Sequence, residues 1–157
     1  MSLPSPHVAD ADHSKKRLRL WLNLLRSTRH VERQVRDLLR AQSGTTLPRF
    51  DVMAALYREE AGLRMSELSR RLMVSNGNVT GIVDRLVTDG MIVRSPVAGD
   101  RRAMRVRLTA RGRETFAEMA ARHEQWIDDL FAALSDGEID RLTASLNKIH
   151  TNRDADR

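Results

Sequence analysis

Apolar residues recur at intervals of three and four over the first part of the chain, the spacing that places side chains on one face of a helix. The pattern predicts a helix over about residues 14–41, with Gly44 available to end it in a left-handed turn. The predicted buried stripe consists of Leu24, Thr28, Val31, Val35 and Leu38. Residues 1–13 lack this pattern, and we expect them to form a flexible arm.

Two shorter helices are predicted next. Thr46 can cap the first of them, and Gly62 comes where that helix should stop. Its predicted inward side chains are Phe50, Met53, Leu56 and Tyr57. The following helix is expected to begin at a Ser66 cap and to bury Leu68 and Leu72. Each helix would therefore bury one side and expose the other.

The centre of the chain predicts a helix-turn-helix followed by a hairpin. After a turn over residues 73–75, a helix is expected over Asn76–Thr88. Its apolar face carries Val79, Ile82, Val83 and Leu86. Alternating apolar and polar residues then predict strands over residues 91–95 and 103–108, joined by a turn-rich loop over residues 96–100.

The last part of the chain predicts two more helices. Thr109 can cap one over about residues 110–134, and Ser135 and Glu138 have the spacing of a capping box that opens the other. The apolar side of the last helix consists of Ile139, Leu142, Leu146 and Ile149. The polar tail from Thr151 is expected to fray. The predicted fold is mainly α with a small β-hairpin wing, a winged helix-turn-helix flanked by N- and C-terminal helices.

Composition narrows the class of protein. The chain has 157 residues, of which 41% are hydrophobic, and this is enough for a sizeable core without metal or disulfide support. It contains no cysteine, which excludes disulfides, thiolate metal sites and thiol redox switches. We expect no membrane span and no secretory signal, and hence a cytoplasmic protein. The formal net charge of +6 favours a polyanionic partner, although charge alone is a weak signal.

The outward face of the helix over Asn76–Thr88 has the chemistry of a DNA reader. It displays Asn76, Gly77, Asn78, Thr80, Gly81, Asp84 and Thr88. Asparagine suits bidentate reading of adenine, and threonine offers a hydroxyl and a methyl group. Glycine weakens a helix by about 1 kcal/mol relative to alanine, so two glycines here suggest close approach to a duplex. The alternative is that these small polar residues merely solvate an exposed helix.

The predicted hairpin tip carries the second DNA-binding signal. Asp100, Arg101 and Arg102 follow Gly99, which places two guanidinium groups where the negative potential of a minor groove can attract one of them. The Asp100 carboxylate can orient one arginine by a bidentate pair. The alternative is a solvated turn with a local ion pair.

Residues 47–112, including MSELSRRLMVSNGNVTGIVDRLVTDGMIVR and GDRRAMRVRLTARG, resemble the MarR family of dimeric transcription regulators. The resemblance implies that Asn76, Asn78 and Thr80 lie in the major groove. It also implies that Arg102 enters the minor groove, and that Arg101 and Arg94 contact the DNA backbone or brace the wing. The DNA-binding residues expected are Ser75, Asn76, Gly77, Asn78, Thr80, Arg85, Arg94, Asp100, Arg101 and Arg102.

The same resemblance implies an obligate homodimer, and the apolar stripes of the flanking helices agree because no sheet covers them. We expect residues 14–47 and 110–153 to form one discontinuous dimerisation domain around a DNA-binding domain over residues 48–109, with a tail over residues 154–157. A two-fold dimer would present two reading helices to a pseudo-palindrome of double-stranded DNA. We expect this dimer to act as a repressor.

Regulators that resemble this chain respond to small molecules, often aromatic anions. Its sequence is similar to that of the branch of the family that responds to aromatic acyl-CoA thioesters. Arg26, Arg29, Arg33, Arg36 and Arg40 form a basic stripe that could clamp a carboxylate or the phosphates of CoA. The alternative is a solvated face. The effector-binding residues expected are Arg26, Arg29, His30, Arg33, Arg49, Phe50, Met53 and Tyr57.

Other classes of function find less support. We see no phosphate-binding glycine loop, nucleophile elbow or metal-ligand cluster, and so expect neither an enzyme nor a cofactor. His30 lies beside an arginine-rich face that disfavours a cation, and His123 lies on an apolar face where a core histidine is commoner than a metal ligand. The remaining alternative is an architectural winged helix that binds DNA without sequence preference.

Overall fold

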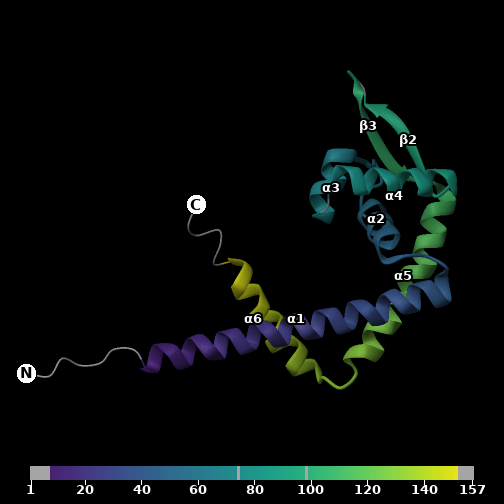
Figure 1. Cartoon of the computed structure of the whole chain (residues 1–157). Helices are drawn as coiled ribbons and strands as arrows, with labels where there is room; N and C mark the ends of the chain where they lie inside the picture. The colour runs from purple at the N-terminus through teal and green to yellow at the C-terminus, as the bar shows by residue number, and fades with distance from the viewer. Residues whose placement is uncertain (1–7, 74, 98, 152–157) are drawn as a thin grey trace, which may run out of the picture. The chain divides into compact units, whose positions relative to one another are not determined.

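The computed structural model describes residues 8–73, 75–97 and 99–151 (Figure 1). Its elements are α1 (Val8–Ser43), α2 (Leu47–Tyr57), β1 (Leu63–Arg64), α3 (Met65–Leu72), α4 (Asn76–Thr88), β2 (Ile92–Val97), β3 (Asp100–Leu108), α5 (Ala110–Phe131) and α6 (Asp136–Thr151). The mainly α fold with a small antiparallel sheet confirms the prediction. The chain divides into two compact units, the first ending at Ala120 and the second beginning at Ala121.

Helix α1 differs from the prediction at its N-terminal end. It begins at Val8, so residues 8–13, which we expected to belong to a flexible arm, are helical. The predicted buried stripe is only partly correct, because Val35 is buried whereas Thr28 is exposed. Leu39, which we did not include, is fully buried. Among the α1 side chains that the structure describes, only those in the C-terminal part of the helix are buried in the core of its unit, where α1 meets α2.

The first unit is built around one apolar core. Its buried side chains are Val35, Leu39, Phe50, Val52, Met53, Leu56, Leu63, Leu68, Val79, Val83, Leu86, Ile92, Val106, Leu108, Phe116 and Met119. They come from α1 to α5 and from all three strands, so the helix-turn-helix and the base of the hairpin share this core. Leu68 is fully buried as expected, whereas Leu72 is only partly buried.

Two predictions for α2 and α3 are wrong. Tyr57 does not point into the core: it is 38% exposed, its ring centroid lies 4.9 Å from that of Phe116, and the Arg113 guanidinium lies 5.0 Å above it. Ser66 does not cap α3, which begins at Met65. The backbone N–H of Arg64 instead donates to the Glu67 carboxylate at 2.8 Å, and this bond fulfils the capping role that we assigned to serine.

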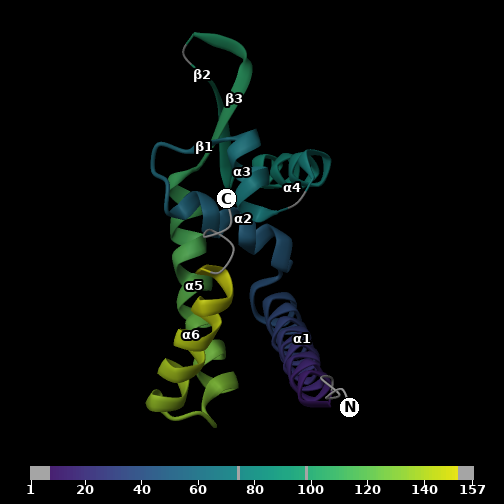
Figure 2. The ribbon, with the colours of Figure 1, turned by 90° about the vertical axis from the view of Figure 1, so that its left-hand side faces the viewer.

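The three strands form an antiparallel sheet in the order β1-β3-β2. The two-residue strand β1 was not predicted, because such a short segment has no measurable alternation. It pairs Leu63 with Val106. Strands β2 and β3 run further toward the tip than expected, with Val97 opposite Asp100. Gly99 has φ +81°, which favours glycine, and the long hairpin projects clear of α3 and α4 (Figure 2).

The second unit contains the end of α5 and all of α6. The Ser135–Glu138 capping box is confirmed, since the backbone N–H and the hydroxyl of Ser135 donate to Glu138 Oε2 at 2.9 and 2.7 Å. These hydrogen bonds hold the pKa of Glu138 below its ordinary value. The apolar side chains of α6 are exposed, namely Ile139, Leu142, Leu146 and Ile149. Helix α5 ends at Phe131, before the expected residue 134.

Candidate nucleic-acid interface

Helix α4 separates an apolar face from a polar face, as the sequence predicts, except that Ile82 of the predicted apolar face is only partly buried. Val79, Val83 and Leu86 are fully buried in the core of the first unit. Gly77, Asn78, Thr80, Gly81, Asp84, Arg85 and Thr88 are exposed. Ser75 stands at the N-cap with extended backbone, although its side chain makes no capping hydrogen bond. The side chain of Asn76 lies outside the described residues. The apolar face of α4 is therefore fixed in the core of the first unit, and the N-terminal half of the helix presents small polar groups to solvent.

The two glycines of this face are not required by packing. A Cβ atom added at Gly77 or at Gly81 would meet no atom within 4 Å, and neither residue has a positive φ. The fold would therefore accept alanine at both positions. Glycine destabilises an exposed helix, and packing does not require it here. The two glycines are therefore best explained by a partner that approaches the backbone of α4 closely.

An ion pair holds the wing against α4. Arg94 on β2 places Nη2 2.6 Å from Oδ1 of Asp84 on α4. The Arg94 side chain is 30% exposed. This contact favours the bracing role for Arg94 among the two roles that the family resemblance left open. Arg85, which we also assigned to DNA, is exposed near the C-terminal end of α4.

Three residues predicted to bind DNA lie at the tip of the wing, at the start of β3. Asp100 is exposed at the first position of β3. Arg101 and Arg102 belong to the same strand, and their side chains lie outside the described residues. The strand nevertheless carries their backbone to the far end of the hairpin, as the sequence predicts.

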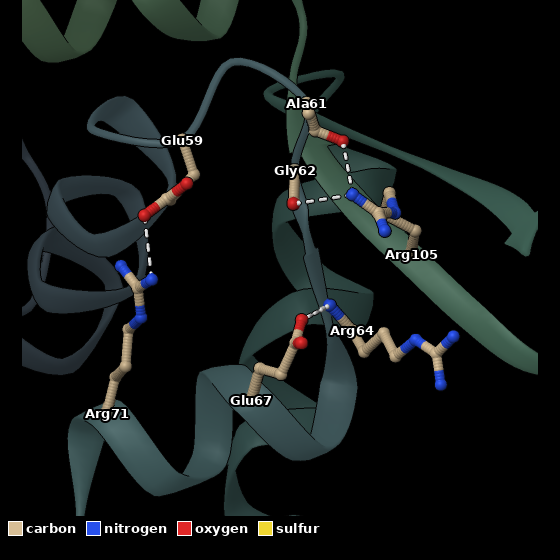
Figure 3. A network of polar contacts seen from close by, with 7 residues as sticks. All are labelled: Glu59, Ala61, Gly62, Arg64, Glu67, Arg71 and Arg105. Atoms are coloured by element: carbon tan, nitrogen blue, oxygen red, sulfur yellow. Dashed lines mark hydrogen bonds and ion pairs between the residues drawn. The ribbon is translucent and has the colours of Figure 1, made fainter.

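The base of the wing is tied to the helix-turn-helix by Arg105, a residue that sequence reasoning missed (Figure 3). Its Nη1 donates to the carbonyl oxygens of Ala61 and Gly62, each at 3.2 Å. Gly62 has φ +76°, and a Cβ atom there would lie 2.4 Å from the carbonyl oxygen of Val106. The loop before β1 thus lies directly on the central strand. The alternation of apolar and polar residues over 103–108 places Arg105 on the polar side of its strand, but the sequence carries no signal for the carbonyl groups that Arg105 meets.

A cavity of about 410 Å³ lies in the same unit, beside the C-cap of α4. Its lining comes from the α1–α2 connection, α2, the end of α4 and the first turns of α5, and includes Ser43, Arg49, Met53, Asp89, Met91, Arg111 and Met119. Arg49 forms an ion pair with Asp89. Sequence reasoning missed Arg111 and Asp89. An acidic residue at the C-terminal end of a helix opposes the helix dipole, and that was the one available signal for a cationic partner of Asp89.

The structure divides the residues that we expected to bind an effector. Arg49 and Met53 line this cavity. Phe50 is buried in the core, with its ring centroid 5.2 Å from that of Phe116, and the ring of Tyr57 lies 4.9 Å from the same phenylalanine. The four α1 residues Arg26, Arg29, His30 and Arg33 are exposed and do not line the cavity. The predicted single effector site is therefore not assembled within one chain.

Metal and membrane sites find no support in the part of the chain that the structure describes. No group of three or more histidine and acidic side chains gathers there at a spacing suited to a metal ion. The ring of His123 lies edge-on to Trp126 at 6.5 Å, and partial burial lowers the pKa of His123. None of the described helices is long and apolar enough to cross a bilayer.

The known proteins that resemble this chain are transcription regulators. A profile of the MarR family matches residues 43–103. A MarR family transcriptional regulator from Silicibacter pomeroyi has a crystal structure with TM-score 0.77 and 36% sequence identity, covering 90% of this chain and 98% of that one. The uncharacterised helix-turn-helix regulator YsmB of Bacillus subtilis is 26% identical over 94% of both chains. The transcriptional repressor MprA of Escherichia coli is 34% identical over 58% of this chain and 52% of MprA.

Proposed function

Because the chain belongs to the MarR family of DNA-binding transcription regulators, which are not enzymes, we propose that it binds a pseudo-palindromic operator as a homodimer and represses transcription. The observation that carries the proposal is the outward face of α4, where exposed Asn78 and Thr80 stand above a fully buried apolar face. A helix so anchored can enter a major groove without loss of its own packing.

The reading residues have distinct roles in this proposal. Asn76, Asn78 and Thr80 contact base edges, while Ser75 and Gly77 bring the helix N-terminus close to a phosphate. Arg102 enters the minor groove beside the wing, and Asp100 orients it. Arg85 and Arg101 contact the DNA backbone, whose phosphates provide affinity without sequence preference.

A second copy of the chain is the partner that best suits the exposed apolar faces of the flanking helices. In α1, Leu18, Leu20, Trp21 and Leu22 are each about half exposed. The apolar side of α6 is exposed as well, through Leu142 and Ile149 among others. Apolar area of this extent on two helices of one small protein favours association. Sedimentation of the purified protein at micromolar concentration should give a dimer and no monomer.

Control by an anionic effector completes the proposal. We propose an aromatic acid or its CoA thioester, which weakens operator binding of a protein that acts in the cytoplasm. Linkage then requires operator DNA to weaken effector binding by the same factor. The transcriptional repressor MprA is 34% identical to this chain over 91 residues, and this similarity supports repression.

The test separates base reading from general DNA binding. Operator fragments selected from random sequence should outcompete bulk DNA at physiological salt, whereas an architectural protein would show salt dependence with little preference. Asn78→Ala should reduce operator affinity by about 1–3 kcal/mol and relax preference at particular base pairs. Thr88→Ala, at the other end of the same helix, is the matched control. Equal losses on operator and random DNA for Asn78→Ala would overturn the reading role.

A further inference from the structure

Met73 is the most exposed large apolar residue in the described part of the chain, with 94% of its surface open to solvent. The other described methionines are buried or partly buried, namely Met53, Met65, Met91, Met104 and Met119. A methionine stabilises a fold by burying its apolar side chain, and Met73 gains almost none of this free energy. Packing therefore does not explain a methionine at this position.

The backbone of Met73 is unusual as well. Met73 is the C-cap of α3 and has φ +53° and ψ +34°, in the left-handed region. The other residues with positive φ in the described part of the chain are glycines. In this conformation a Cβ atom crowds the following carbonyl oxygen, so helices that end in this way usually do so at glycine. A residue that is both strained and exposed points to a function, because neither backbone geometry nor packing favours it.

Met73 lies beside the end of α4 that we propose to enter the major groove. It comes two positions before Ser75, the N-cap of α4, so their Cα atoms are at most about 7.6 Å apart. The backbone N–H of Met73 donates to the carbonyl of Arg70 at 3.3 Å, which ties this turn to the end of α3. An apolar side chain at this place can contact the sugars and thymine methyl groups of the DNA that α4 reads.

The thioether of Met73 is the most accessible oxidisable sulfur in the described part of the chain. The protein has no cysteine, so no thiol competes for an oxidant. Hydrogen peroxide transfers one oxygen atom to a thioether: the sulfur loses two electrons and becomes a sulfoxide, and the peroxide is reduced to water. The product is polar where the thioether was apolar, and methionine sulfoxide reductases reverse the change.

We propose that Met73 is an oxidation site for peroxides, and that its sulfoxide weakens binding of the operator. The sulfoxide oxygen is a hydrogen-bond acceptor, and at the rim of the reading helix it faces phosphate oxygens, which are acceptors too. The thioether has no such conflict and contacts apolar groups of the DNA. This inference goes beyond the proposed function and rests on it for the place of the DNA. A chain without cysteine thus responds to peroxide through the turn of its helix-turn-helix.

Mass spectrometry of tryptic peptides tests the site. Met65, Met73 and Met91 fall in different peptides, because arginines lie between them. In the full-length protein treated with hydrogen peroxide, the sulfoxide should form several-fold faster at Met73 than at Met65 or Met91. Saturation with operator DNA should slow the reaction at Met73. Equal rates at the three methionines overturn the oxidation site, and a rate at Met73 that operator DNA does not change overturns its contact with DNA.

The effect on DNA binding is measured as the ratio of operator affinities after and before peroxide. The wild-type protein should lose affinity several-fold, and methionine sulfoxide reductase should restore it. Met73→Leu, whatever its starting affinity, should lose none on treatment, whereas the matched control Met65→Leu should respond as the wild type does. Thermal unfolding should be the same before and after treatment, because the Met73 side chain is exposed. A loss in Met73→Leu equal to that of the wild type overturns the proposal.

The two proposals fail in different ways. If the untreated protein does not prefer operator over random DNA, the proposed function is wrong and the effect of oxidation on operator binding falls with it. If the untreated protein prefers operator, and the protein with the Met73 sulfoxide binds it equally well, the effect of oxidation is wrong and operator binding stands.

Discussion

Arg94 on β2 and Asp84 on α4 are joined by an ion pair in which Nη2 lies 2.6 Å from Oδ1. The pair connects the two elements that we propose to enter adjacent grooves of DNA. A brace between them fixes the angle of the wing relative to the reading helix, so that both can engage one duplex.

Removal of Asp84 distinguishes a brace from a phosphate contact. Asp84→Asn removes a negative charge near DNA, which by itself would raise affinity for every sequence. If Arg94 is a brace, Asp84→Asn should instead lower operator affinity by about two- to fivefold, in line with the modest strength of a partly exposed pair. Fluorescence anisotropy with operator and random DNA measures both effects. Glu114→Gln carries the same charge change on α5, and tighter binding by Asp84→Asn than by this control would contradict the brace.

Replacement of Gly81 should separate stability from DNA binding. No atom lies within 4 Å of a Cβ at this position, so Gly81→Ala should raise the free energy of unfolding by up to about 1 kcal/mol. The added methyl group would hold the helix away from the duplex, and operator affinity should fall. Urea unfolding and operator titration measure the two quantities. An alanine variant that is stabilised and binds operator as tightly as wild type would show that α4 does not approach the bases closely here.

Gly112 should be intolerant of the same change. A Cβ atom there would lie 2.1 Å from the carbonyl oxygen of Met91, which is backbone and cannot move aside cheaply. The Thr109 N–H donates to that same oxygen at 3.0 Å. We expect Gly112→Ala to lower the free energy of unfolding by about 1–3 kcal/mol, as in other overpacked sites. In Gly137→Ala the nearest atom would be the flexible end of Arg141 at 3.5 Å, so this control should unfold like wild type.

Asp51 should make stability depend on pH. Burial, and then the nearby charge of Glu32, raise the pKa of Asp51 above its ordinary value of 3.8. Ionised Asp51 is therefore less favourable in the folded than in the unfolded chain. This loss of stability is present above the folded pKa and disappears as the pH falls below 3.8. Asp51→Asn should raise the melting temperature at neutral pH, and the gain should shrink as the solution is acidified. A gain that grows on acidification would contradict this assignment.

Local pattern was sufficient to predict the helix-turn-helix and its wing. Val79, Val83 and Leu86 alternate with polar residues at helical spacing, so the buried and outward faces of α4 follow from a periodicity that the packing merely confirms. The Ser135–Glu138 cap follows in the same way from two residues three positions apart. Such features depend on neighbours within one turn of a helix or one strand.

Contacts between distant segments could be decided only by the tertiary structure. Arg105 reaches Ala61 and Gly62 across more than forty residues of chain, and Arg49 reaches Asp89 over a similar separation. In the sequence Arg105 looks like an ordinary surface charge, and Arg49 was expected to bind an effector and not a carboxylate of the same chain. The partners of Arg105 are two backbone carbonyl groups, and the partner of Arg49 is one of many carboxylates in the chain. No periodicity in the sequence marks any of these groups as a partner. The sequence by itself therefore determined which residues face outward, whereas the folding of α2, α4 and α5 around one core decided which charges meet, because only that packing brings them within hydrogen-bonding distance.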